Sequence, residues 1–287
     1  MYNSPDIKPS QSILEKGLPV TRRKALLAGV ASCLLLGNIK SPSVPASNAG
    51  EAGRVLRIID GDSFVLALDT GEELSVRLST VQAPRTAQRA ARAWPYASES
   101  KAGLSALIKG RDVQLYYAGE RRDRYGRAIA QVYTVDSQGE SDLWVQGEMI
   151  RLGLARVFSW KGELADMAAL YALETEARRR SRGLWVDPFY AVRKPDPDPL
   201  AQYVDSLQIV EGIVTSTADV RGQIYLNFGA DYKTDFTIAV AKKHAKQFAE
   251  IDPVSLAGAR VRVRGWIELI NGPMIWLDHP GRLEILS

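Results

Sequence analysis

Arginine and carboxylate side chains are the main candidates for chemistry in this chain of 287 residues, because it has only 2 His and 1 Cys. Zinc sites, Cys/His dyads and Ser-His-Asp triads draw on His and Cys, so the composition argues against them. A disulfide within the chain is impossible with one Cys. Arginine holds anions through a fixed fork of N–H donors, whereas carboxylates bind hard cations or accept protons.

Four short strings in the first two thirds of the chain carry these residue types. In chain order they are Ile59-Asp60-Gly61-Asp62-Ser63, Arg77-Leu78 followed by Ala83-Pro84, Arg122-Asp123-Arg124-Tyr125-Gly126-Arg127, and Gly153-Leu154-Ala155-Arg156-Val157. The stretch from Leu74 to Ser98 contains no Asp or Glu at all, but it contains four arginines. A local cationic surface is expected there.

In this order and spacing, the four strings resemble the staphylococcal nuclease (thermonuclease) family over about Arg54 to Pro188. The resemblance implies a β-rich α+β fold, with a five-stranded OB-type barrel and three helices. In active members it implies calcium-dependent hydrolysis of phosphodiesters in DNA and RNA at one rim of the barrel. Likeness assigns Asp62 to the metal, and Arg77 and Arg127 to the phosphate. Each has an alternative, because Asp62 could cap its turn and each arginine could pair with a surface acid.

The chain departs from the family at two positions that matter for cleavage. Active members carry an Asp as second metal ligand and a Glu as proposed general base, where this chain has Gln82 and Arg85. The Gln amide offers one neutral oxygen, and a guanidinium accepts no proton at any relevant pH. No nearby acid can restore the site by a register slip, since Leu74 to Ser98 lacks acids. We therefore predict that a calcium site is weak or absent.

What remains suits holding a phosphate better than cutting it. The residues expected to contact nucleic acid are Arg85, Arg89, Arg92, Arg124 and Tyr125. The loop from Arg85 to Arg92 has a plainer alternative as a solvated loop. The aromatic residues Trp94, Phe158 and Trp160 could stack on bases, although aromatic residues in a small barrel are more often core.

Residues 1–50 have the anatomy of an export signal and spacer: a polar start, the pair Arg22-Arg23, a short apolar run and then small residues. The order of residues resembles a twin-arginine signal, which predicts a periplasmic or secreted protein. The apolar run is too short to span a bilayer. Acylation at Cys33, as in bacterial lipoproteins, is disfavoured because the apolar run continues past it.

The remainder divides into two folded segments. Residues 51–190 form the nuclease-like domain, with a hairpin signal at Asp69-Thr70-Gly71 and helical periodicity at Ala97 to Ile108, Leu143 to Leu154 and Leu164 to Tyr171. Residues 191–200 are a Pro/Asp linker that neither a helix nor a central strand should tolerate.

Residues 201–287 are predicted to form a second, small OB-like β-barrel domain. Strands are expected at Ile209 to Val214, Ile224 to Phe228, Phe236 to Val240, Val261 to Leu269 and Met274 to Leu277, with a turn at Asn271-Gly272 and a short helix from Lys242 to Ala249. Arg262 and Arg264 should share one strand face, where single strands could bind, although residues 191–287 total 11 basic and 12 acidic residues. His244 and His279 are expected to be surface or packing residues.

The formal net charge of +4 belongs to the first 50 residues, which carry 6 basic and 2 acidic side chains, so the remainder is neutral. Three functions stay open at this point. The first is an exported protein that binds nucleic acid or another phosphodiester with little hydrolysis. The second is an active metal-dependent endonuclease with an altered site, and the third is a protein-interaction module of the cell envelope.

Overall fold

The computed structural model describes residues 49–87, 92–160, 164 and 166–286, all of which lie in one compact unit, Lys40–Ser287. The predicted export signal, the arginine pair, Cys33 and Arg89 lie outside the described residues. Among the helices described, none has the length and apolarity needed to cross a membrane.

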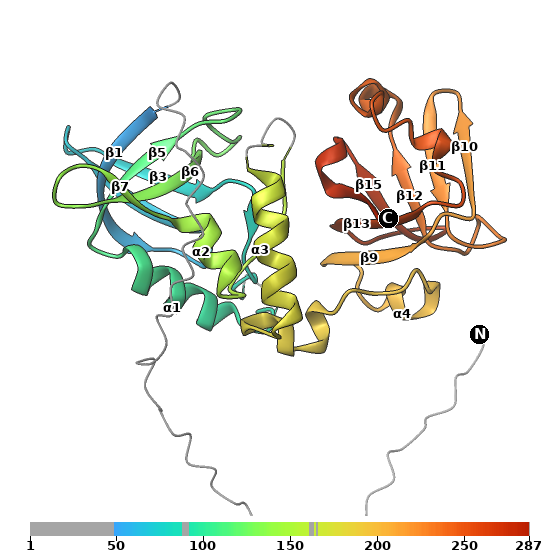
Figure 1. The fold of residues 1–287 in the computed structure, drawn as a ribbon, viewed down its shortest axis with the longest axis horizontal. Helices are drawn as coiled ribbons and strands as arrows, with labels where there is room; N and C mark the ends of the chain where they lie inside the picture. The colour runs from blue at the N-terminus through green and yellow to red at the C-terminus, as the bar shows by residue number, and fades with distance from the viewer. Residues whose placement is uncertain (1–48, 88–91, 161–163, 165, 287) are drawn as a thin grey trace, which may run out of the picture. The chain divides into compact units, whose positions relative to one another are not determined.

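The first domain is a closed five-stranded barrel (Figure 1). Its strands are β1 (Ala49–Ile58), β2 (Ser63–Leu68), β3 (Glu73–Leu78), β5 (Asp112–Tyr116) and β6 (Ala128–Val135). The first three form an antiparallel meander, β3 then pairs in parallel with β6, and β5 joins β6 back to β1. This order closes the ring and confirms the predicted OB-type barrel.

The β2–β3 hairpin turns where the sequence predicts it. Gly71 adopts a φ of +84°, and its N–H donates to the Leu68 carbonyl at 2.9 Å. A positive φ costs glycine almost nothing, which explains this residue type at this position. Strand β1 begins at Ala49, so it includes Ala49 and Gly50, which the sequence analysis placed in the spacer.

Three helices cover the barrel: α1 (Ala97–Ile108), α2 (Val145–Arg151) and α3 (Met167–Arg179). The predicted helix from Leu143 was wrong at its start, since Ser141–Trp144 form strand β7 and Trp144 pairs with Tyr133 of β6. A short apolar run next to a helix is compatible with both helical and strand periodicity. Here the residues form a strand because they pair with β6. A short ladder joins β4 (Val81–Gln82) to β8 (Arg156–Val157).

The segment after the first domain is more ordered than predicted. Two 3-10 turns, η2 (Gly183–Val186) and η3 (Pro188–Tyr190), lead to a bridge between Arg193 and Val210 and to the helical turn α4 (Pro197–Ala201). The expectation that this linker tolerates no helix was wrong. Pro197 stands in the first turn, where the missing N–H would have no partner in a helix.

The strands of the second domain form a five-stranded and a three-stranded sheet. Its strands are β9 (Leu207–Ile213), β10 (Ser216–Val220), β11 (Gln223–Asn227), β12 (Thr237–Val240), β13 (Arg260–Trp266), β14 (Glu268–Ile270), β15 (Gly272–Leu277) and β16 (Leu283–Leu286). The β10–β11–β12 meander is followed by a parallel pair of β12 and β15, and β9 pairs with β13. The 3-10 helices η4 (Lys242–Phe248), η5 (Pro253–Leu256) and η6 (Pro280–Arg282) complete the domain.

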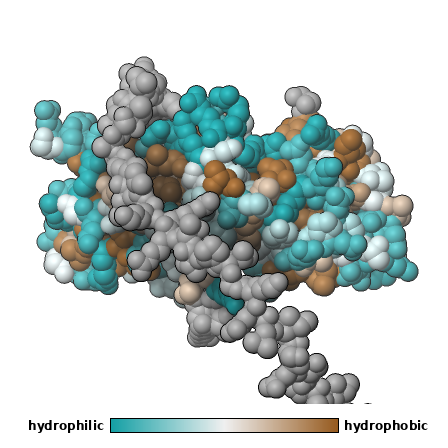
Figure 2. All heavy atoms as spheres, turned by 90° about the horizontal axis from the view of Figure 1, so that it is seen from below, coloured by the Kyte–Doolittle hydropathy of each residue, from teal (hydrophilic) through white to brown (hydrophobic). Residues whose placement is uncertain are grey.

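Four of the predicted strands of this domain correspond to β9, β11, β12 and β15. The fifth, from Val261 to Leu269, was wrong as a single strand, because it divides at Ile267 into β13 and β14, and two strands, β10 and β16, were missed. Strand β10 is polar and mostly exposed, and β16 is an edge strand beside β13, so neither shows a clear apolar alternation. The predicted turn occurs at Asn271, whose φ is +63°. Each domain has its own apolar core, and the surface seen in Figure 2 is a hydrophilic one with small apolar patches.

The outer face of β13 contacts the first domain. Arg264, whose side chain is 1% exposed, pairs with Glu174 of α3 at 2.9 Å and donates to the Val157 carbonyl at 3.0 Å. Its other terminal nitrogen reaches Glu284 at 2.7 Å. Arg262 pairs with Glu211 at 2.7 Å on the same face. The shared face of Arg262 and Arg264 is thus confirmed, but carboxylates and α3 cover it, so it offers no open basic surface.

Substitution of Arg264 by alanine should destabilise the protein by about 3–5 kcal/mol, because it leaves the Glu174 carboxylate buried without its partner. Arg260→Ala on the same strand is the matched control, since Arg260 pairs with Glu211 while its side chain is 62% exposed. The control should change stability by about 1 kcal/mol or less. Urea unfolding measures the free energy of unfolding of both variants. Equal losses of this free energy would contradict a special role for the buried pair of Arg264 and Glu174.

Candidate functional site

Asp62 lies in the turn between β1 and β2, with a residue exposure of 5%. Asp60 organises this turn, because its Oδ1 accepts from the Asp62 N–H at 3.1 Å and from the Ser63 hydroxyl. Gly61 allows the turn to approach α1, since a Cβ there would lie 1.9 Å from the Ser100 Oγ. Capping therefore falls to Asp60, and the Asp62 carboxylate is directed to other partners.

The amide of Gln82 joins Asp62 to Arg77. Its Nε2 donates to the Asp62 Oδ2 at 3.1 Å, and its Oε1 accepts from an Arg77 terminal nitrogen at 2.9 Å. The backbone N–H of Ala83 donates to the same Asp62 oxygen at 2.9 Å. Strand β4 holds Gln82 in this place through its ladder with β8. Three residues singled out from sequence are thus brought together, with the neutral amide lying between two charged groups.

Burial raises the pKa of Asp62 from its ordinary value of 3.8 to about 7, although the Arg77 cation opposes the shift. The nearby Asp60 carboxylate adds to the rise. Near neutral pH the Asp62 side chain is therefore partly protonated. A carboxyl group that holds its proton is a poor ligand for a cation.

The donor set at this rim does not fit a calcium ion. Calcium takes six to eight oxygen ligands and depends on carboxylates for charge. Here one Asp62 oxygen accepts two N–H donors, and the Gln82 oxygen accepts from Arg77. Within the described ranges, no group of three or more His, Cys, Asp or Glu side chains is placed to hold a metal.

Arg85, at the position of the family's proposed base, lies over aromatic rings. Its guanidinium carbon is 4.0 Å from the ring centre of Trp266 and 5.5 Å from that of Trp94. Burial and the Arg77 cation lower the pKa of Arg85, while Asp62 and Asp205 act in the opposite direction. Trp266 and Asp205 belong to the second domain, and no local pattern in the sequence connects them with position 85.

Arg127 precedes β6 by one residue. Arg77 of β3 pairs with Ile129 of β6, so Arg127, two residues before Ile129, points to the same side of the sheet as Arg77. Its Nε donates to Asp123 at 2.8 Å. The predicted alternative, a surface ion pair, is therefore the arrangement seen for Arg127.

The other predicted contact residues are spread along the surface. Tyr125 is 70% exposed, with the guanidinium carbon of Arg124 5.0 Å from its ring centre. Arg92 is exposed on the loop before α1, and Arg89 lies outside the described residues. Of the three aromatic candidates, Phe158 is buried core, whereas Trp160 is 36% exposed and lies 5.1 Å from the Arg77 guanidinium carbon. Trp94 contacts Phe189 and Trp266.

Arg156 is a further member of the site region that sequence reasoning passed over. It lies opposite Gln82 in the β4–β8 ladder and is 2% exposed. Its two terminal nitrogens have no hydrogen-bond partner among the described residues, and its guanidinium carbon lies 4.8 Å from the Tyr190 ring centre. Burial lowers the pKa of Arg156 to about 10. The sequence signal for Arg156 is the string Gly153-Leu154-Ala155-Arg156-Val157, which carries part of the family resemblance.

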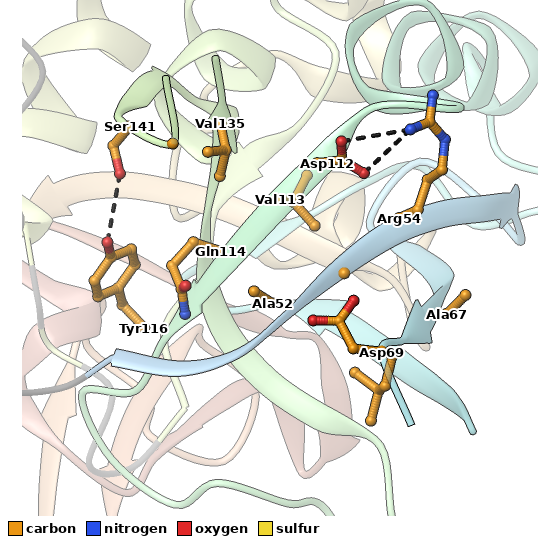
Figure 3. A pocket seen from close by; sticks show the side chains of 13 residues that line it. Ala52, Arg54, Ala67, Asp69, Asp112, Val113, Gln114, Tyr116, Val135 and Ser141 are labelled. Atoms are coloured by element: carbon orange, nitrogen blue, oxygen red, sulfur yellow. Dashed lines mark hydrogen bonds and ion pairs between the residues drawn. The ribbon is translucent and has the colours of Figure 1, made fainter. Parts of the chain in front are cut away.

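A separate, open pocket of about 600 Å³ lies across β1 and β5 (Figure 3). Arg54 and Asp112 form an exposed ion pair at 3.4 Å there, and the Tyr116 and Ser141 hydroxyls lie 3.4 Å apart. Figure 3 shows these pairs at separate places along the pocket wall. None of the site residues predicted from sequence lines it, so it is not the site of the nuclease-like motifs.

Comparison with known proteins identifies the family. An uncharacterized endonuclease of Escherichia coli O157:H7 is 32% identical over 145 residues, which span 50% of this chain and 84% of that protein. The family model described as staphylococcal nuclease homologue matches residues 75–187. The chain belongs to the staphylococcal nuclease family. A micrococcal nuclease of Shigella flexneri is 32% identical over 57% of this chain and 87% of its own length.

Membership of the staphylococcal nuclease family gives the first domain a nuclease-like character. A thermonuclease of Staphylococcus hyicus matches as well, with 26% identity over 50% of this chain and 81% of its own length. The stretch matched by the family model includes Arg77, Gln82, Arg85 and Arg127, while Asp62 precedes it.

Asp62→Asn should stabilise the protein at alkaline pH. The unfolded chain loses this proton near pH 3.8 and the folded chain near 7, so the unfolded state binds fewer protons in between and stability falls as pH rises. Above pH 7 the charged Asp62 costs at most about 4 kcal/mol. The side-chain oxygen of Asn can still accept from the Gln82 amide and the Ala83 N–H, which both donate to Oδ2 of Asp62.

Urea unfolding at pH 4 and pH 8 measures this effect. The variant should match the unmodified protein at pH 4 and exceed it by about 2–4 kcal/mol at pH 8. Asp69→Asn, at an exposed turn, controls for the loss of one charge. A loss of stability at pH 8 for Asp62→Asn would show that the carboxylate is needed in its charged form.

Proposed function

We propose that this protein binds nucleic acid, or another phosphodiester, through retained arginines, and that hydrolysis is weak or lost. The observation that carries the proposal is the amide of Gln82, which links the Asp62 carboxyl to Arg77 where active relatives would need a second carboxylate. The hydrogen bonds satisfy Asp62 without a cation.

Cleavage would also need a group that activates water. Arg85 occupies the position of the family's proposed base and cannot accept a proton. Its place over the Trp266 ring also ties it into a structural contact. Loss of a metal ligand and of a base together removes two of the largest contributions to phosphodiester hydrolysis.

Binding requires cations that are free to meet a phosphate. Arg77 has a buried Nε without a hydrogen-bond partner in the described part of the chain, and a terminal nitrogen of Arg77 donates to the neutral amide of Gln82. Arg85 and Arg92 add positive charge at an acid-free stretch of sequence. Arg127 can contribute if phosphate competes with Asp123 for its guanidinium.

A second candidate is an active metal-dependent endonuclease with an altered site. The names of the relatives favour it, since they include endonucleases and a micrococcal nuclease. Asp60 and Asp62 would then have to supply the metal ligands. A third candidate, an envelope module in which both domains contact proteins, predicts neither cleavage nor binding of nucleic acid.

Export is part of the proposal. The support is the order of residues 1–50, which resembles a twin-arginine signal and predicts a periplasmic or secreted location. Because β1 already begins at Ala49, cleavage after Ala46 would leave the barrel intact, whereas cleavage after Ala49 would remove its first residue.

The double variant Gln82→Asp with Arg85→Glu should gain calcium-dependent cleavage of DNA. The new carboxylate at 82 would lie beside Asp62, so the two negative charges repel until a cation binds between them. Calcium should therefore also raise the melting temperature of Gln82→Asp, and it should leave that of the exposed control Gln138→Asp unchanged.

The assay follows cutting of single- and double-stranded DNA and RNA with calcium, magnesium or chelator. Metal-dependent cutting by the unmodified protein that disappears in Asp62→Ala would overturn the proposal in favour of the second candidate. A folded double variant that binds calcium and still does not cut would place the defect at other residues.

Arg77→Ala should weaken binding of a labelled oligonucleotide and lower the slope of log K against log salt by about 1, as expected for one lost phosphate contact. Arg57→Ala is the control, because that exposed arginine already forms an ion pair with Glu73, at a distance of 2.8 Å. Fluorescence anisotropy at several salt concentrations measures both. Equal slopes for the two variants would contradict a phosphate contact at Arg77.

A further inference from the structure

The second domain has an open pocket of about 410 Å³ that none of the nuclease-like motifs reaches. Its walls come from Ala241 and η4, from β13, β14 and β15, and from η6. The residues that matter for its chemistry are Trp266, Trp276, Lys243, Glu268, Asp278 and Arg282. The family match ends at residue 187, so this pocket lies in the part of the chain that the match does not cover.

Strand alternation directs both tryptophans outward. On β15, Ile275 and Leu277 pack into the core, so Trp276 between them faces the pocket. On β13, Val263 is core, which puts Trp266 on the outer face. Both indoles are only partly buried. Two such rings in one open pocket offer flat apolar surface to a flat, apolar partner.

The pocket adjoins the proposed phosphate-binding arginines. Trp266 lines the pocket and also contacts Arg85, whose guanidinium carbon lies 4.0 Å from the centre of the Trp266 ring. Arg85 in turn is close enough to Arg77 for that cation to add to the effect of burial, which lowers the pKa of Arg85. A chain with a phosphate at these arginines could therefore place its neighbouring group in the pocket.

The charges of the pocket suit a nucleobase better than a phosphate. Lys243 and Arg282 are balanced by Glu268 and Asp278, and Arg282 already pairs with Asp278. Carboxylates repel phosphate, but they accept hydrogen bonds from the exocyclic amino groups of bases. The volume is near the low end for ligand pockets, which suits one ring system and leaves a base pair outside.

We propose that this pocket binds an unpaired base of single-stranded nucleic acid, stacked on Trp276 and Trp266, while the adjacent phosphate lies at Arg77 and Arg85. The proposal rests on the proposed function of the first domain and adds the kind of strand that it would hold. Stacking of bases on aromatic side chains tolerates any sequence, so selectivity for single strands over duplex is expected without selectivity for sequence.

The test uses the full chain and fluorescein-labelled DNA 12-mers in three forms: single-stranded, duplex, and single-stranded with abasic sites throughout. The unmodified protein should bind the single strand more tightly than the duplex. Trp276→Ala should weaken binding of the single strand about tenfold and leave the abasic strand unchanged. Trp276→Phe, which keeps a ring, should lose less than Trp276→Ala.

Tyr232→Ala is the matched control, since Tyr232 is an exposed aromatic residue of the same domain and does not line the pocket. Trp276→Leu keeps apolar volume without a stacking face, so it tests the idea if the alanine variant unfolds. Both are checked by thermal melting before binding is measured.

The outcomes separate this proposal from the one on which it rests. If Arg77→Ala weakens binding while Trp276→Ala and Trp276→Leu bind the single strand like the unmodified protein, the pocket proposal alone is wrong. Equal affinity for single strand and duplex would also overturn it. If no 12-mer binds at low salt, both proposals fall together.

Discussion

The buried ion pair between Arg264 and Glu174 is the interaction on which the arrangement of the two domains depends. Two charges that are each 1% exposed are stable only when they meet with good geometry, and here Glu284 and the Val157 carbonyl complete the bonding of Arg264. Apolar contacts would tolerate a shift along α3, but a hydrogen-bonded pair does not. The pair thus sets the register of β13 against the first domain.

That register has consequences at the nuclease-like rim. Trp266 follows Arg264 by two residues on the same face of β13, so the ion pair also positions the Trp266 indole against Arg85. Near the same contact, the Tyr171 hydroxyl donates to the Gly281 carbonyl, and His279 lies 3.1 Å from the Ser159 carbonyl. Arg85, at the position of the family's proposed base, is therefore part of the contact between the two domains.

At the rim, N–H donors and a raised pKa satisfy the buried carboxyl group of Asp62. A buried carboxylate needs positive charge, protons or N–H donors. Asp62 takes N–H donors from Gln82 and Ala83, and burial lets it keep its proton near neutral pH. Gln82 contributes through both ends of its amide, which a carboxylate at this position could not do beside Asp62. The substitution is therefore consistent with its surroundings.

The sequence by itself determined the elements and the inventory of the site. Alternation and turn residues such as Gly71 and Asn271 predicted most strands, and the four motif strings predicted the barrel, Asp62, Arg77 and the departures at 82 and 85. Local pattern also showed that Arg262 and Arg264 share a face. It missed β7 and β10, where pairing with a neighbouring strand outweighs an ambiguous or polar pattern.

Only the tertiary structure decided what those residues touch. In the tertiary structure Arg264 pairs with Glu174, which lies 90 residues earlier in the chain, and Arg127 pairs with Asp123. The terminal nitrogens of Arg156 are buried without a hydrogen-bond partner in the described residues. The tertiary structure also brought Trp266 to Arg85 and beside Trp276 in one pocket. The physical reason is that periodicity reports which side of an element a residue faces, whereas the charge or ring that it meets depends on how elements distant in the chain pack together.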